Sequence, residues 1–139
     1  MREILFRGKR IDNGKWAFGL PTTRRPDVQE VDAIDTGDYF DNEFGVLVRQ
    51  IEKVDPETIG QYTGLEDKNC VGIFEGDILR YIKNNRDIDR VPFKVIWDNE
   101  YARWAWQDKT KDSLYPSITT NCEILGNVFD NPELLEEQK

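Results

Sequence analysis

Large apolar residues alternate with small or charged ones along several short segments of this chain. Trp16, Phe18 and Leu20 alternate with smaller residues, and the segment 91–97 repeats the pattern. A period of two is typical of a strand with one buried face. The pair Asn13-Gly14 tolerates positive φ at both positions, so residues 1–20 are predicted to form a β-hairpin.

The central stretch, residues 58–82, has the same character. Its sequence, TIGQYTGLEDKNCVGIFEGDILRYI, alternates apolar runs with polar or glycine-containing breaks. Glycine supplies backbone freedom at a turn, and aspartate can accept a hydrogen bond from its own turn. We therefore expect strand, turn, strand, turn, strand, with turns at Gly60, Gly64, Gly76 and Asp77. The predicted core residues are Trp16, Phe18, Tyr62, Ile78 and Trp97.

The remaining segments complete a β-rich pattern. Strands are expected at 28–34, 46–51, 101–106 and 122–129, with a bulge at Gly126, and an exposed turn region at 35–45. A single helical turn should follow Asp55-Pro56, and Asn131 should cap a short acidic helix over 132–137.

Many short strands separated by turn signals are typical of an all-β barrel or sandwich. We predict barrel-like, mixed or antiparallel sheets with a few short helices, in a single domain over residues 1–139. Two separate small barrels, one in each half, stay an open alternative.

Composition narrows the chemistry. The chain has no histidine, which removes the most common general base and histidine-ligated metal sites. Its net charge of −8 opposes non-specific binding to phosphate backbones. Cys70 and Cys122 lie far apart and form no metal-ligand spacing, so we expect no metal and no cofactor. No apolar run is long enough to cross a bilayer, and no secretory leader is evident. We therefore expect a cytoplasmic protein with reduced thiols.

Four blocks of sequence resemble the YopX family of phage- and prophage-encoded proteins. They are FRGKR at 6–10, GKWAFG at 14–19, the run from Val54 through Ile78, and ILGNVFDNPELL at 124–135. The resemblance covers nearly the whole chain. It implies a largely β fold, self-assembly in some members, and no established catalytic activity. Phage or host proteins in a bacterial cell are the partners that it implies.

One position departs from the family pattern. Similar sequences tend to have Asn-Gly where this chain has Asn69-Cys70. Because a side chain is costly at positive φ, the tight turn is in doubt here, and the thiol is expected on an exposed loop.

An alternative function is nucleic-acid binding by a small barrel. Trp104 and Trp106 are two residues apart and share a face of a strand, with Arg103 beside them in the sequence. Exposed rings of this kind stack bases. The same spacing is typical of a strand that packs its aromatic face into the core, and we favour that interpretation.

A third possibility is a dimeric aspartic hydrolase. Asp35-Thr36-Gly37 is the triplet of aspartic proteases, in which two aspartates share a proton. A plain Asp-Gly turn explains the same residues. The acidic residues Asp35, Asp38, Asp41 and Glu43 also suggest a calcium site, although they lack the spacing of an EF-hand loop.

We therefore expect a non-enzymatic protein-interaction module that associates with itself into a homo-oligomer. The chain combines many strand-facing aromatic residues with few catalytic groups. Nucleic acid is not an expected partner, and no membrane association is expected.

Overall fold

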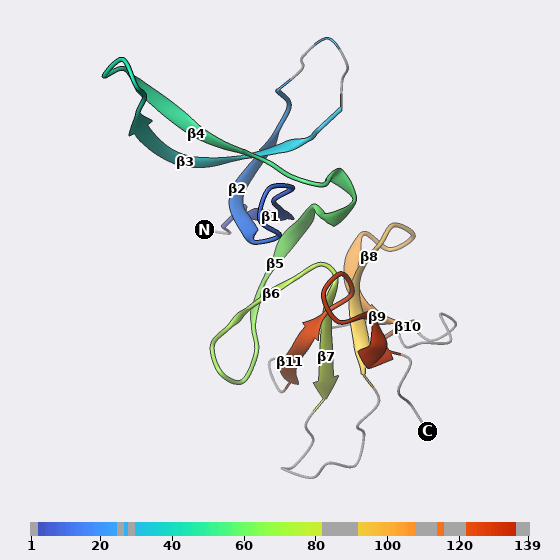
Figure 1. Ribbon diagram of the computed structural model, residues 1–139. Coiled ribbons are helices and arrows are strands. Elements are labelled where there is room, and N and C mark those ends of the chain that lie inside the picture. The colour runs from blue at the N-terminus through green and yellow to red at the C-terminus, as the bar shows by residue number, and fades with distance from the viewer. Residues whose placement is uncertain are drawn as a thin grey trace. The chain divides into compact units, whose positions relative to one another are not determined.

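The computed structural model describes residues 3–24, 27, 30–81, 92–107, 114–115 and 122–135 (Figure 1). The predicted strand start at Val28, the residue Val91 and the acidic end Glu136-Glu137 lie outside this part of the chain. The chain divides into two compact units, residues 1–61 and 62–139, and each unit is described by itself.

The first unit is built from antiparallel strands. They are β1 (Phe6–Lys9), β2 (Trp16–Thr22), β3 (Ala33–Asp41), β4 (Leu47–Lys53) and the start of β5 (Gly60–Glu66), hydrogen-bonded in the order β4-β3-β2-β1-β5. A 3-10 turn, η1 (Pro56–Thr58), precedes β5, and the Asp55 side chain caps it by accepting a hydrogen bond from the Glu57 N–H. Ala17, Ile34 and Val54 are buried together, with Phe6 and Ile59 packed against them.

In the second unit β5 continues and pairs with β6 (Gly72–Phe74). A five-stranded antiparallel sheet has the order β10-β9-β8-β7-β11. Its strands are β7 (Asp77–Tyr81), β8 (Phe93–Asp98), β9 (Arg103–Gln107), β10 (Leu114–Tyr115) and β11 (Cys122–Asn127), and the 3-10 turn η2 (Pro132–Leu135) follows. The core consists of Ile73, Leu79, Phe93, Val95, Trp106 and Cys122.

The all-β prediction is confirmed. The hairpin over residues 1–20, the three strands of the central stretch, the helical turn after Asp55 and the irregularity at Gly126 are all present. The strands pair antiparallel throughout the described residues, where neither sheet closes into a barrel, so the barrel-like description is not confirmed. The single domain over 1–139 stays a prediction, since it is a statement about folding cooperativity.

Three expectations are wrong. The segment 35–41 belongs to β3 and is not part of an exposed turn region. Gly60 and Gly64 lie inside β5, where Gly64 has a φ of 86° at an irregularity of the β5–β6 pairing. Gly76 does form the turn before β7, and Asp77 Oδ2 accepts a hydrogen bond from the Phe74 N–H across it.

The predicted core is right only in part. Ile78 is fully buried, and Trp16 and Tyr62 are half-buried. Phe18 is 47% exposed and Trp97 is 39% exposed, so neither is a core residue. Phe18 lies on the exposed face of β2 together with Leu20, because the neighbouring Ala17 is the residue that packs into the core with Ile34 and Val54.

The turn at Cys70 keeps its geometry without glycine. Cys70 has a φ of 62°, in the left-handed region, and its N–H donates to the Asp67 carbonyl at 3.0 Å. The Asp67 carboxylate accepts hydrogen bonds from the N–H groups of Asn69 and Val71, and from that of Ile124 on β11. These bonds offset the cost of a side chain at positive φ.

None of the helices among the described residues has the length and apolar character that crossing a bilayer requires.

Candidate interaction surface

The first unit has a second, exposed sheet face opposite its core. Directly opposed residues of neighbouring strands point to the same face. Leu20 of β2 opposes Asp35 of β3, which opposes Ile51 of β4. Side chains alternate along a strand, so Phe18 and Arg49 join this face, and Tyr39 opposes Arg49. We call this set the outer face: Phe18, Leu20, Asp35, Tyr39, Leu47, Arg49 and Ile51.

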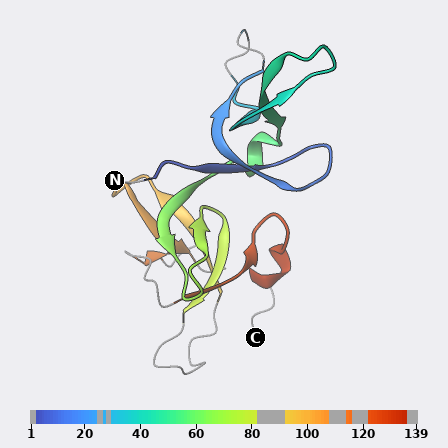
Figure 2. The ribbon, with the colours of Figure 1, turned by 90° about the vertical axis from the view of Figure 1, so that its left-hand side faces the viewer.

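The strands β3 and β4 continue beyond this sheet as a two-stranded arm, residues 38–49. Figures 1 and 2 both show this hairpin reaching away from β1 and β2. Its tip is a tight turn in which Asn42 Oδ1 accepts hydrogen bonds from the N–H groups of Phe44 and Val46. Gly45, with a φ of 73°, allows the chain to reverse there.

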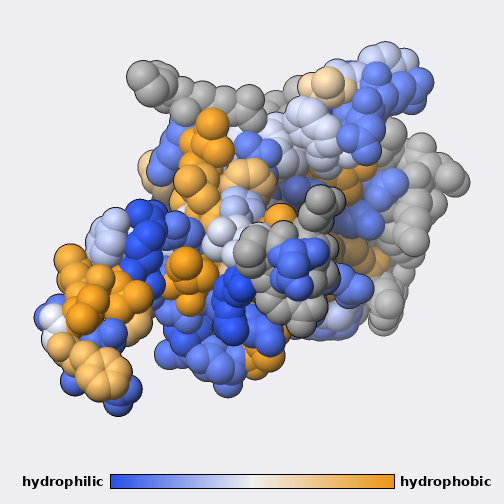
Figure 3. Space-filling model, turned by 90° about the horizontal axis from the view of Figure 1, so that it is seen from above, coloured by the Kyte–Doolittle hydropathy of each residue, from blue (hydrophilic) through white to orange (hydrophobic). Residues whose placement is uncertain are grey.

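The arm exposes apolar side chains on both of its faces. Leu47 lies on the outer face and is 64% exposed, whereas Phe40 and Val48 oppose each other on the other face and are also exposed. Phe44 at the tip is 80% exposed. Hydrophobic residues accordingly gather at the end of the hairpin, at the left of Figure 3. An isolated two-stranded hairpin is only marginally stable, and exposed apolar clusters mark interaction sites.

Two charged groups of the outer face, Asp35 and Arg49, neutralise each other. Arg49 Nη2 lies 2.8 Å from Asp35 Oδ2, and Arg49 Nη1 donates to the Tyr39 hydroxyl at 2.9 Å. The Gly37 N–H also donates to Asp35, and together with Arg49 it lowers the pKa of this carboxyl. Asp35 is therefore ionised at neutral pH, and the surroundings of the pair are apolar.

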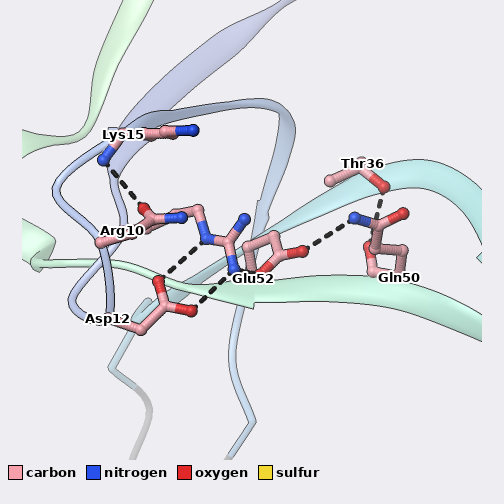
Figure 4. Close-up of polar contacts among 7 residues, drawn as sticks. Arg10, Asp12, Lys15, Thr36, Gln50 and Glu52 are labelled. Carbon is pink, nitrogen blue, oxygen red and sulfur yellow. Dashed lines mark hydrogen bonds and ion pairs between the residues drawn. The ribbon is translucent and has the colours of Figure 1, made fainter.

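A second set of polar contacts holds the base of the arm (Figure 4). Arg10 Nη2 lies 2.7 Å from Asp12 and 3.1 Å from Glu52. Gln50 Nε2 donates to Glu52, and the Gln50 carbonyl accepts from the Thr36 hydroxyl. These contacts join β4 to the turn between β1 and β2. Beside them lies an open hollow of about 320 Å³, lined by Ile11, Asp12, Arg24, Ile51, Glu52 and Lys53.

The residues of the nucleic-acid alternative lie in the second unit. Trp106 is only 4% exposed and belongs to the core, and Trp104 packs against that core, so their shared face is the inner one. Arg103 points to the other face, where its Nε donates to Asp98 at 3.1 Å. The three residues therefore do not present a common stacking surface. Nucleic-acid binding as such stays an untested alternative.

The geometry around Asp35 is that of a structural turn. Its carboxylate accepts from the Gly37 N–H and pairs with Arg49, the contacts expected of an Asp-Gly turn within β3. The acidic residues near it do not converge either. Among the described residues, no three acidic or cysteine side chains gather closely enough to hold a metal ion.

The two thiols differ in environment. Cys70 is exposed and Cys122 is buried, and both are free. Burial, with a smaller contribution from the charge of Asp67, raises the pKa of Cys122 to about 11. Cys122 is therefore an inert core residue at neutral pH.

The arm is the feature that sequence reasoning missed. The segment 35–45 is rich in aspartate and glycine, and this composition indicated a turn region. The available signal was the pair of apolar runs, Tyr39-Phe40 and Val46-Leu47-Val48, on either side of a polar turn.

Comparison with known proteins relates nearly the whole chain to a solved structure and to a protein family. The crystal structure of protein EF1440 from Enterococcus faecalis superposes with a TM-score of 0.60 at 26% sequence identity. The match covers 97% of this chain and 99% of that chain. No curated protein matches. The model of a family described as YopX protein matches residues 5–136, which confirms the predicted resemblance. The chain belongs to the YopX family.

Proposed function

We propose that the protein is a non-enzymatic interaction module that associates with other copies of itself through the arm and the outer face of its first unit. The observation that carries this proposal is the exposure of apolar side chains on both faces of the arm, with Phe44 at its tip. Such side chains gain about 1.5–3 kcal/mol each when a partner buries them fully.

The chemistry of the outer face supports a protein partner. Phe18, Leu20, Tyr39 and Ile51 surround a neutralised Asp35–Arg49 pair. Interface cores are poor in unpaired charge and rich in aromatic residues and arginine. A phosphate backbone would instead be recognised by several unpaired cations, and Arg49 is already held by Asp35.

Light scattering coupled to size-exclusion chromatography tests the proposal on the full chain. We expect a mass that is a multiple of 16.3 kDa and that falls on dilution. A strict monomer across the accessible concentration range would overturn the proposed self-association.

A further inference from the structure

The outer edge of β4 is open. β4 is the last strand on its side of the sheet, and within the described residues no strand pairs with its far edge. Its C-terminal end is occupied, because the Ile11 N–H donates to the Lys53 carbonyl at 3.2 Å. The edge from Leu47 to Glu52 is left with backbone groups that a further strand can bond.

This edge lacks a proline and a bulge, two of the features by which proteins prevent edge pairing. It carries one inward-facing charge, Glu52, which opposes the buried Ile34 and pairs with Arg10 of the same chain. Natural edges carry proline, a bulge or inward-pointing charges. The sequence of β4, LVRQIEK, contains no proline. The irregularity of the hairpin lies in β3, between Asp35 and Tyr39, and leaves β4 extended.

The sequence of β4 is compatible with one antiparallel register against itself. With Gln50 opposite Gln50 of a second copy, Arg49 opposes Ile51 and Val48 opposes Glu52. Like charges never oppose each other in this register. A shift by two positions in one direction places Arg49 opposite Arg49, and the same shift in the other direction places Arg49 opposite Lys53. Both of these registers are disfavoured, because like charges directly opposed on neighbouring strands are destabilising.

The same register accounts for the apolar tip of the arm. Leu47 of the second copy would come beside Lys53, where Ile11 ends the open edge and the hollow of about 320 Å³ begins. Two walls of that hollow, Ile11 and Ile51, are apolar and exposed. Leu47 of one arm thereby meets the two apolar walls, Ile11 and Ile51, of the otherwise charged hollow at the base of the other.

We propose that two copies of this chain pair antiparallel through their β4 edges, with a twofold axis at Gln50. The proposal rests on the self-association proposed above and names its contact. The pair forms one continuous sheet from the two first units. Each arm lies along the base of the other.

Site-specific disulfide formation tests the contact in the full chain. In a Cys70→Ser background, in which Cys122 stays buried, Gln50→Cys would place two thiols across the axis. Directly opposed Cα atoms are about 4.5–5.5 Å apart, within reach of a disulfide. The matched control is Val48→Cys, since residues 48 of the two copies would be offset by four positions, or about 13 Å along the strands. Under mild oxidation we expect Gln50→Cys to form covalent dimers at least about tenfold faster than Val48→Cys, because paired thiols have a far higher effective concentration.

Light scattering on the same background separates the two proposals. Association together with preferential cross-linking at residue 50 supports the β4 contact. Association with equal or no cross-linking at the two positions, or with preference for residue 48, overturns the β4 contact and leaves self-association standing. A monomeric protein overturns both.

Discussion

Arg49 on β4 and Asp35 on β3 form an ion pair of 2.8 Å on the exposed sheet face of the first unit, beside Leu20 and Ile51. Tyr39 accepts a hydrogen bond from the same guanidinium group. Because the charges neutralise each other, Leu20 and Ile51 beside them can be covered by another protein without leaving a charge unpaired. The pair therefore makes this face suitable for burial in an interface.

The core of the first unit depends on Ile34. This residue is fully buried, whereas Ile11 is mostly exposed. We expect Ile34→Ala to lower the free energy of unfolding by about 2–5 kcal/mol, the usual range for such a deletion in a core. Ile11→Ala should change it by less than about 0.5 kcal/mol. Chemical denaturation measures both, and equal effects would show that the core is misassigned.

The same measurement addresses the single domain over residues 1–139. Ile78 is the fully buried counterpart in the second unit. If the chain is one cooperative domain, Ile34→Ala and Ile78→Ala both shift one common unfolding transition. Two transitions, each moved by only one variant, would contradict the single-domain prediction.

The two cysteines should react differently. Cys70 is exposed, and Cys122 is buried with a pKa raised to about 11. An aromatic disulfide reagent should modify Cys70 in the native protein and both thiols after denaturation. The folded state favours the neutral thiol of Cys122, so its contribution to stability is full below pH 9 and is lost as the pH rises toward 11. Modification of both thiols in the native protein would contradict this assignment.

Cys70 also tests the departure from the family pattern. A side chain on a residue in the left-handed region lowers the stability of the fold by roughly 1–2 kcal/mol. Glycine avoids this strain, but part of the gain is offset because glycine loses more conformational entropy on folding. We expect Cys70→Gly to raise the free energy of unfolding by about 0.5–1 kcal/mol. Cys70→Ala keeps the Cβ and should give no such gain. A destabilising Cys70→Gly would mean that the thiol itself contributes to the turn.

Acid should weaken the turn that Asp67 anchors. Burial alone would raise the pKa of Asp67, but backbone N–H groups of Val71, Ile124 and Asn69 lower it below 3.8 overall. A depressed carboxyl pKa contributes stability above the unfolded value, which is lost as the pH falls through the folded value. The loss of stability between pH 7 and pH 3 should be smaller in Asp67→Asn than in the parent, as denaturation at the two pH values would measure. An equal loss would show that other carboxylates, such as Asp35 and Glu123, account for it.

Much of the fold could be predicted from sequence because local patterns determine it. Alternation identified the strands at 16–20 and 93–97, and Asn13-Gly14 identified the first hairpin. Alternation does not show which face will be covered. In β2 the large residues Phe18 and Leu20 face outward, and the small residue Ala17 packs into the core with Ile34 and Val54.

The interaction surface was harder to predict for a related reason. Asp35, Gly37 and Asp38 interrupt β3 with an irregularity that still preserves its pairing with β4, and composition alone cannot distinguish that from a loop. Trp104 and Trp106 do share a face, as their spacing predicted. Only the pairing of Val95 with Trp106 places that face against the core.

The role of the arm is tested most directly by removing its apolar tip. We compare the double variant Phe44→Ser/Leu47→Ser with Ile4→Ser/Val71→Ser, which removes two exposed apolar side chains elsewhere. We expect light scattering to find oligomers in the parent and in the Ile4/Val71 variant. The Phe44/Leu47 variant should be monomeric and should still unfold cooperatively, with a midpoint equal to that of the parent at dilutions at which the parent is itself monomeric. Equal masses for all three proteins would contradict the account.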